Sequence, residues 1–134
     1  MFKKVDHIGI AVKSIEEALK LFRDTMGLEL ENIEEVADQK VRIAFLPVGE
    51  THIELIEPTS PDSNVAKFLE SKGEGIHHIA LCVEDVAAAL TAFREKDVPL
   101  IDKEPRIGGG NKKIAFIHPK GTHRVLIELC QDMA

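Results

Sequence analysis

Hydrophobic and polar positions along the first part of the chain predict a strand followed by a helix. Residues 5–13 alternate with the period of two that is typical of a strand with two unlike faces. Ser14 and Glu17 then form a capping box, and Gly27 marks the end of the helix that this box opens. The helix has one apolar stripe, formed by Ile15, Ala18, Leu19, Phe22 and Met26.

The same pattern returns in the second part of the chain. Residues 75–83, GIHHIALCV, predict a strand, and Asp85 is the expected N-cap of a second helix. The apolar stripe of that helix consists of Val86, Ala89, Leu90 and Phe93. An offset of 71 residues relates His7 to His78, and the same offset relates the first four stripe residues of the two helices. A shared offset across strand, cap and helix indicates a duplicated unit.

Further strands follow each predicted helix. Two segments, residues 40–58 and residues 111–131, each predict a strand, a turn and a strand, and both contain IAF and IEL. The two turns are expected at residues 47–50 and 119–122, where Pro and Gly occur. The two segments therefore extend the repeat to the second half of each unit.

One more strand per half completes the predicted unit. Residues 28–36 and 98–102 are expected to form these strands, and a short helix over about residues 63–72, ended by Gly73, is expected between the halves. The order in each half is then strand, helix, strand, strand, strand. Such a βαβββ unit buries one face of its sheet under its own helix.

The predicted fold class is α+β, with two tandem βαβββ repeats whose uncovered sheet faces curl into a cup. A chain of 134 residues argues for one domain, residues 1–134. Within it, repeat one is expected over about residues 5–58, the linker with its short helix over about 59–74, and repeat two over about 75–131.

One histidine of each half points away from the predicted helix. In the first strand the large apolar residues share the face that is expected to pack on the helix, and His7 shares the other face with Gly9 and Ala11. His78 takes the equivalent position in the matching strand. The adjacent His77 points to the opposite face and is expected to be structural. A row of small residues beside a histidine is typical of a surface that a ligand approaches.

One glutamate of each half is placed in the same way. Glu54 and Glu128 each lie between apolar residues of a predicted last strand and point to the opposite face from them. Burial of an unpaired carboxylate costs on the order of several kcal/mol, so such a residue is normally paired or bound to a metal. The alternative is that each glutamate forms a salt bridge with Arg or Lys, and that each histidine is only a polar strand end.

Two imidazoles and two carboxylates at matched positions suit one divalent metal ion, which makes the predicted cup a metal-binding cup. The candidate ligands are His7, Glu54, His78 and Glu128. Imidazole combined with carboxylate favours Zn, Co, Ni, Mn or Fe over Ca, and four protein ligands to a six-coordinate ion leave two positions open.

Composition argues against some classes of partner and indicates a compartment. The chain is 44% hydrophobic and 30% charged, with a net charge of −6 and no long basic run, so nucleic acid is not an expected partner. No apolar run reaches the length of a membrane helix, and the start MFKKVDHI has no secretory signal. Cys82 and Cys130 are isolated in apolar runs and read as buried thiols in a reducing compartment, which predicts a cytoplasmic protein.

The paired repeat with its His and Glu residues resembles the vicinal oxygen chelate superfamily. The segments DHIGIAV, IELIEP, GIHHIALCVEDV and GGGNKKIAFIHPKGTHRVLIEL resemble the methylmalonyl-CoA epimerase family over essentially the whole chain. The resemblance implies His7, Glu54, His78 and Glu128 as metal ligands. It also implies cobalt as the preferred ion, with Zn, Mn or Ni as alternatives, a CoA thioester substrate and a homodimer.

The resemblance further implies interconversion of (2R)- and (2S)-methylmalonyl-CoA by metal-assisted proton transfer at the α-carbon, through an enolate. Inversion needs a base on each side of that carbon. Glu128 is the expected base and Glu54 its expected partner, with His118 and Lys120 as further candidates. An ungapped alignment places Arg42 where some relatives have a catalytic glutamate, which leaves the second base open.

Several other residues have two interpretations. Gly108–Gly110 is expected to form a hairpin or loop rather than a ligand lid, and His52 and His123 are expected at the surface. A set of basic residues could contact CoA phosphates but is expected to be a solvated edge: Lys112, Lys113, Lys120 and Arg124. The alternative functions are glyoxalase I, which uses the same class of ligands, and a metal-free small-molecule-binding protein of the same fold.

Overall fold

The computed structural model describes residues 1–133, which divide into two units. The first unit comprises His7–His77, and the second comprises Met1–Asp6 together with the chain from His78 onward. Strand β1 (Phe2–Ala11) begins in the second unit and ends in the first, and β5 (Gly75–Val83) does the reverse. The sequence pattern gave no sign that residues 1–6 belong with the second half.

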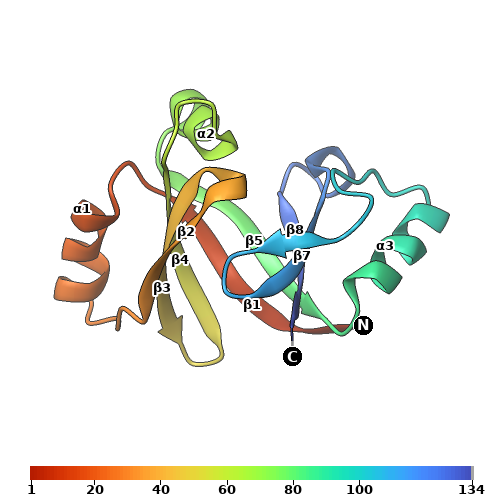
Figure 1. Cartoon of the computed structure of the whole chain (residues 1–134), viewed down its shortest axis with the longest axis horizontal. Coiled ribbons are helices and arrows are strands. Elements are labelled where there is room, and N and C mark those ends of the chain that lie inside the picture. Colours follow the sequence, from red (N-terminus) through yellow and green to blue (C-terminus); the bar gives the residue numbers. More distant parts are fainter. Residues whose placement is uncertain (134) are drawn as a thin grey trace. The chain divides into compact units, whose positions relative to one another are not determined.

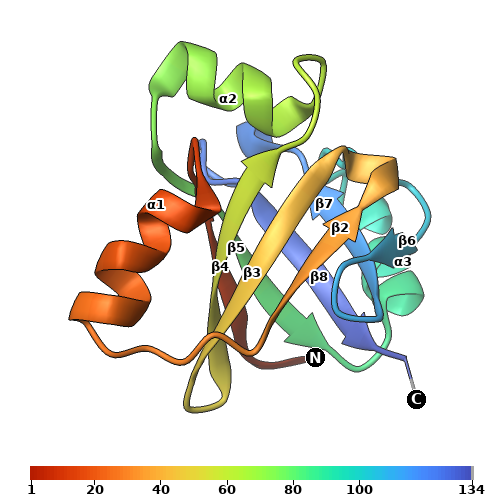
Figure 2. The same ribbon diagram turned by 60° about the vertical axis from the view of Figure 1, so that its left-hand side comes forward.

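The first unit follows the predicted order. After β1 come α1 (Ile15–Leu19), the π-helix η1 (Lys20–Thr25), β2 (Asn32–Val36), the 3-10 helix η2 (Ala37–Gln39), β3 (Val41–Val48), β4 (Thr51–Pro58) and α2 (Asn64–Lys72). The strand order is β2-β3-β4-β1, with antiparallel pairing throughout except that β1 runs parallel to β4. Figure 2 shows β2, β3 and β4 side by side.

The second unit repeats this plan. After β5 come α3 (Val86–Glu95), β6 (Arg106–Gly108), β7 (Lys112–Ile117), the 3-10 helix η3 (Pro119–Gly121) and β8 (Ile127–Asp132). The strand order is β5-β8-β7-β6, and β5 is parallel to β8 as β1 is to β4. The predicted α+β fold of two βαβββ repeats is confirmed.

Each sheet half packs one face against its helix. In the first unit Ile15 and Leu19 of α1 are buried against Leu46 and Leu55, and α1 lies beside β3 and β4 in Figure 1. In the second unit the α3 side chains pack on β7 and β8, and the cluster consists of Val83, Val86, Ala89, Leu90, Ala115, Ile117 and Leu129. Burial of one large aliphatic side chain contributes about 1.5–3 kcal/mol, so these two layers account for much of the stability of each unit.

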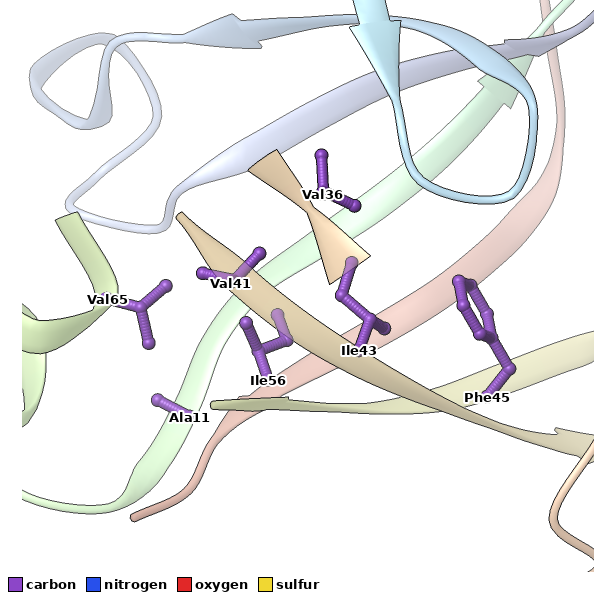
Figure 3. Packing of buried hydrophobic residues seen from close by; sticks show 7 residues of the cluster. All are labelled: Ala11, Val36, Val41, Ile43, Phe45, Ile56 and Val65. Atoms are coloured by element: carbon purple, nitrogen blue, oxygen red, sulfur yellow. The ribbon is translucent and has the colours of Figure 1, made fainter. Parts of the chain in front are cut away.

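The opposite sheet faces are also buried, but they differ in chemistry. In the first unit this face carries an apolar cluster that Val65 of α2 covers (Figure 3): Ala11, Val36, Val41, Ile43, Phe45, Ile56 and Val65. In the second unit it carries Ala80, Cys82, Ile114, Phe116 and Cys130. Both cysteines are free thiols and buried, as predicted, and burial raises the pKa of the Cys130 thiol.

The N-termini of both helices are held by matching contacts from the last strands. The predicted N-caps, Ser14 and Asp85, accept hydrogen bonds from the backbone N–H groups of Glu17 and Ala88. In addition, the N–H of Ile15 donates to Glu57 Oε1 at 2.8 Å, and the N–H of Val86 donates to Gln131 Oε1 at 2.9 Å. These side chains satisfy amide groups that have no partner within the helix.

The first helix differs from its prediction. It is α-helical only to Leu19 and continues as a π-helix, in which the N–H of Met26 donates to the carbonyl of Leu21, five residues back, at 2.8 Å. This wider turn rotates later residues away from the 3.6-residue stripe. Met26 is consequently 57% exposed, so its prediction as a stripe residue was wrong.

The strand predicted at residues 98–102 is also absent from the structure. Leu100 forms only an isolated bridge with Ile117, and the carboxylate of Asp102 accepts the N–H of Phe116 at 2.8 Å. Because a side chain takes this donor, the backbone ladder cannot continue there, and β6 pairs with β7 instead.

Two other strand boundaries differ from their predictions. In the first half, β2 is shorter than the predicted strand of residues 28–36 and begins at Asn32. In the second half, the turn after Pro119 extends to Leu126, with His123 and Arg124 at φ of 56° and 73°, so that β8 begins only at Ile127.

Among residues 1–133, no helix is long and apolar enough to cross a membrane. The helix predicted over about residues 63–72 is confirmed, with Ser63 as its N-cap and Gly73 as its C-cap.

Candidate functional site

The first unit joins its predicted histidine and glutamate in one buried pair. His7 lies on β1 and Glu54 on the parallel neighbour β4, where the partner of Glu54 is Gly9. Glycine has no side chain, so the carboxylate has room to lean along the strand towards His7. The Nδ1 atom of His7 is 3.1 Å from Oε2 of Glu54, and both residues are at most 5% exposed.

The second unit contains the equivalent pair. His78 lies on β5 and Glu128 on the parallel neighbour β8, where the partner of Glu128 is Ala80. The Nε2 atom of His78 is 3.2 Å from Oε1 of Glu128, and both residues are buried to the same degree as the first pair. The ring of His78 packs edge-on against Phe116, with the ring centroids 5.7 Å apart, which fixes the orientation of the imidazole.

Two buried pairs of ionisable side chains are unusual inside a sheet. Burial of an ionised carboxylate is costly unless hydrogen bonds or a cation compensate for lost water. In each unit the glutamate meets a histidine that can act as a hydrogen-bond donor or as a ligand of the same metal ion. The structure thus brings the predicted histidine and glutamate of each half together in one pair, in place of the alternative salt bridges of each glutamate with Arg or Lys.

Arg42, the residue aligned with a glutamate of some relatives, lies on the other face of the sheet. Its Nη2 atom is 3.1–3.2 Å from both carboxylate oxygens of Glu57 and 3.0–3.1 Å from those of Glu16, at the start of α1. The hydrogen bond to Glu16 is the main reason that the pKa of Arg42 is raised. Alternation along β3 gives the signal that was missed, because Arg42 shares its face with the helix-packed Ala44 and Leu46.

On the face that carries Glu54, β3 presents only apolar side chains. Phe45 is the direct partner of Glu54, and Val41 and Ile43 lie further along the same face. This strand therefore brings no acid or base to the His7–Glu54 pair.

His52 was expected at the surface but is half-buried on the same face of β4 as Glu54. Its Nε2 atom is 3.3 Å from Oε1 of Glu31, and its ring packs edge-on against Phe45. His77, by contrast, packs its ring on Phe68 of α2, in keeping with the structural role expected for it.

Among the basic residues of the second unit, Lys112 is not the solvated edge residue that was expected. Its side chain is only 16% exposed, and its ammonium group is 3.3 Å from Asp6 and hydrogen-bonded to Asp132. Burial lowers the pKa of Lys112, but the hydrogen bond to Asp132 and the charges of both carboxylates outweigh burial, so the pKa is raised. Lys112 is thus a fixed cation inside the second unit.

The two further candidates for a base, His118 and Lys120, are exposed at the start of η3. His118 accepts the N–H of Lys120 on its Nδ1 atom at 3.1 Å and so caps this short helix. Gly108–Gly110 forms the end of β6 and the turn into β7, which is the hairpin that was predicted.

A hollow of about 380 Å³ in the first unit lies on the helix side of β1, the face opposite His7. It is lined by Ile10, Val12, Ser14, Glu17, Ala18, Leu21, Phe22, Glu74 and Gly75. The lining contains none of the four predicted ligands, so this hollow is separate from the His–Glu chemistry.

Comparison with known proteins identifies the family that this chain matches. The family model described as the glyoxalase/bleomycin resistance protein/dioxygenase superfamily matches residues 6–116. An ethylmalonyl-CoA/methylmalonyl-CoA epimerase of Cereibacter sphaeroides is 36% identical over 98% of this chain and 99% of its own length. An uncharacterized protein of Bacillus subtilis (strain 168), YqjC, is 47% identical over 96% of this chain and 91% of its own.

Solved structures agree with these relatives. A methylmalonyl-CoA epimerase in complex with methylmalonyl-CoA and NH4+ superposes with a TM-score of 0.96 and 38% identity, covering 100% of this chain and 97% of that one. Similarity of this extent shows that the fold is shared over the whole chain.

Proposed function

Because the chain belongs to the glyoxalase/bleomycin resistance protein/dioxygenase superfamily, and within it to the methylmalonyl-CoA epimerase family, we propose that it interconverts (2R)- and (2S)-methylmalonyl-CoA. The substrate is a CoA thioester, and the reaction inverts the carbon between the thioester carbonyl and the carboxylate. The observation that carries the proposal is the presence of two buried His–Glu pairs at matched positions of the two repeats.

The donor set of these pairs fits one divalent cation held by His7, Glu54, His78 and Glu128. With bonds of about 2.0–2.2 Å, neighbouring ligand atoms on a six-coordinate ion are about 3.0 Å apart. The histidine and glutamate atoms of the two pairs are 3.1 and 3.2 Å apart, close to this separation. When bound, the cation supplies Lewis acidity that stabilises negative charge on the substrate oxygens. Cobalt is the proposed ion, with Zn, Mn or Ni as alternatives.

Glu128 and Glu54 are the proposed bases. Glu128, ionised, accepts the α-proton on one side of the carbon, which leaves an enolate, and Glu54, protonated beforehand from solvent, donates its proton on the other side. Solvent then removes the proton from Glu128 and returns one to Glu54, and the roles exchange in the reverse reaction. A carboxylate that binds a cation is a weaker base, so partial release of each glutamate on substrate binding is part of the proposal. The burial of both glutamates supports it, because exclusion of bulk water favours direct proton transfer between a carboxylate and the substrate carbon.

The surroundings of the pairs support this choice of the second base. Arg42 is engaged with Glu16 and Glu57 on the helix side, and the Glu54 face of β3 is apolar. His118 and Lys120 are exposed, which makes them weaker candidates than a buried carboxylate.

Proton NMR of (2R)-methylmalonyl-CoA in D2O tests the proposed function. We expect the protein to remove the α-proton signal rapidly, EDTA to stop the exchange and added Co2+ to restore it. No exchange by a protein that holds a metal ion would contradict the epimerase proposal and would lead to assays with glyoxalase substrates. No exchange and no bound metal would favour a small-molecule-binding protein of this fold.

The assignments of a homodimer and of a cytoplasmic location stay predictions. Light scattering coupled to size-exclusion chromatography measures the first directly, with a mass of twice 14.8 kDa as the expected result.

A further inference from the structure

A second cluster of buried polar side chains lies in the second unit, beyond the His78–Glu128 pair. Cys82 of β5 and Cys130 of β8 are direct partners on parallel strands, so their side chains lie next to each other on one face. Asp6, from the part of β1 that belongs to the second unit, reaches the same place. The two Sγ atoms and a carboxylate oxygen of Asp6 all lie within 4.8 Å of one another.

The three side chains are almost completely enclosed. Asp6 is 4% exposed, Cys82 is 2% exposed and Cys130 is fully buried. Lys112 contacts the carboxylate of Asp6 at 3.3 Å and is also bonded to Asp132. The cluster therefore combines two thiols, a carboxylate and a fixed ammonium group inside a sheet.

The first unit shows that the fold does not require these residues. The positions equivalent to Cys82 and Cys130 are Ala11 and Ile56, which are also direct partners on parallel strands. The position equivalent to Asp6 is His77, which packs on a phenylalanine. Because hydrocarbon side chains satisfy packing at the two cysteine positions in one repeat, the two thiols in the other call for a different explanation; the position of Asp6 is polar in both repeats.

We propose that Asp6, Cys82 and Cys130 bind a thiophilic cation of the Zn2+ or Cd2+ class, through a ligand set that differs from the four ligands proposed in the His–Glu pairs. Zinc takes thiolate sulfur at about 2.3 Å and carboxylate oxygen at about 2.0–2.2 Å, which places neighbouring ligand atoms about 3.5–3.8 Å apart. Ligand atoms that are already within 4.8 Å of one another reach this spacing with small side-chain rotations.

The charges of the cluster balance when such a cation binds. Both thiols release their protons to solvent on binding, as metal-bound cysteines do. Two thiolates and the Asp6 carboxylate then carry three negative charges, and Lys112 carries one positive charge. The remaining two negative charges match a divalent cation, and the further carboxylate on Lys112, that of Asp132, is 68% exposed to solvent.

Ligand chemistry separates this site from the His–Glu pairs. Thiolates select soft ions, whereas imidazole and carboxylate accept harder ions such as Mn2+. Cysteine thiolates also give an ultraviolet charge-transfer absorption with Cd2+ that imidazole and carboxylate do not give. The thiolate site therefore has a signature that does not depend on catalysis.

Titration of the reduced, metal-free full chain with CdCl2 tests the proposal. We expect a thiolate-to-Cd absorption that saturates with one Cd2+ per chain at micromolar or lower free Cd2+. His78→Ala is the control, because His78 is a ligand proposed for the other cation and is not grouped with Asp6, Cys82 or Cys130, so its removal leaves the absorption in place. No such absorption from the folded protein, or saturation only at millimolar Cd2+, would overturn the proposal.

Variants of the cluster assign the ligands. Cys82→Ala reproduces the alanine of the first repeat, and we expect it to remain folded by circular dichroism and to lose tight Cd2+ binding. Asp6→Asn is expected to keep the absorption but to weaken Cd2+ binding at least tenfold. Unchanged affinity in both variants would show that the cluster is not the site.

Discussion

The two repeats agree in their His–Glu pairs and differ on either side of them. His7 with Glu54 and His78 with Glu128 join the same two strands of each βαβββ unit and have nearly equal separations, 3.1 and 3.2 Å. Next to these pairs, the first unit has alanine and isoleucine where the second has two cysteines. The helices differ as well, since α3 is a regular α-helix whereas α1 continues as a π-helix.

This comparison separates what the fold needs from what the site needs. Packing positions in the two units have accepted different residues and even a different helix type, so the architecture alone does not fix them. The His–Glu pairs, by contrast, have the same residue types, similar burial and nearly equal separations in the two units. This agreement supports the proposal that the pairs serve one shared chemical task, and the following variants test it at matched positions.

The largest effect is expected from the two glutamates. Glu128→Gln and Glu54→Gln each remove one proposed base, and loss of a general base lowers a rate by about 10²–10⁴-fold. We expect both variants to fold and to lose epimerisation, measured by NMR with each epimer separately. A near wild-type rate of inversion in either variant would show that the glutamate replaced in it is not a required base, so the two pairs would not have equivalent roles.

Matched core substitutions are expected to have the next largest effect. Leu55 and Leu129 occupy equivalent strand positions and are both fully buried against their helices. Leu55→Ala and Leu129→Ala should each lower the free energy of unfolding by about 2–5 kcal/mol, measured by urea denaturation. A loss in one unit of less than about 1 kcal/mol would show that its helix layer is not part of the stabilising core.

The hydrogen bonds that Glu57 and Gln131 of the last strands make with the two helix N-termini allow a further comparison of the two units. Glu57 bonds the first helix and Arg42, whereas Gln131 bonds only the second helix in the contacts described above. Because hydrogen bonds that involve charged groups are worth more, Glu57→Ala should cost about 1.5–3 kcal/mol and Gln131→Ala about 0.5–1.5 kcal/mol. Equal losses on urea denaturation would mean that the Arg42 interaction adds nothing.

The smallest effect is expected from pH. A backbone hydrogen bond and then Arg42 lower the pKa of Glu16 below its ordinary 4.5, and the equivalent residue of the second helix is Ala87. A lowered folded pKa means that the stabilisation is complete above about pH 4.5 and is lost as the pH falls through the lower value. NMR titration should show that Arg42→Gln moves the Glu16 pKa towards 4.5. An unchanged pKa would remove Arg42 as a cause.

Much of this arrangement could be predicted from the repeat offset. The repeat located the two histidines, the two glutamates and both N-caps, because duplicated residues keep their place in a shared backbone, whereas the His–Glu pairing itself is seen only in the structure. It did not locate the π-helix, since a hydrogen bond from Met26 to Leu21 instead of Phe22 depends on tertiary packing. It also did not predict that residues 98–102 do not form a strand. There the side chain of Asp102 accepts a hydrogen bond from the backbone N–H of Phe116.

Other misses had different physical causes. The orientation of Arg42 follows from strand alternation and could have been found from sequence. The burial of Lys112 could not, because its partner Asp6 comes from a segment at the other end of the chain that joins the second unit.

The central claim is that the two pairs hold one cation together, and Mn2+ binding tests it most directly. Mn2+ favours carboxylate and imidazole over thiolate, so it reports on the pairs alone. Electron paramagnetic resonance of free Mn2+ should show one tight site per chain, and this site should be lost in both His7→Ala and His78→Ala. Two Mn2+ per chain, with one retained in each variant, would show that the pairs act independently and would contradict the account.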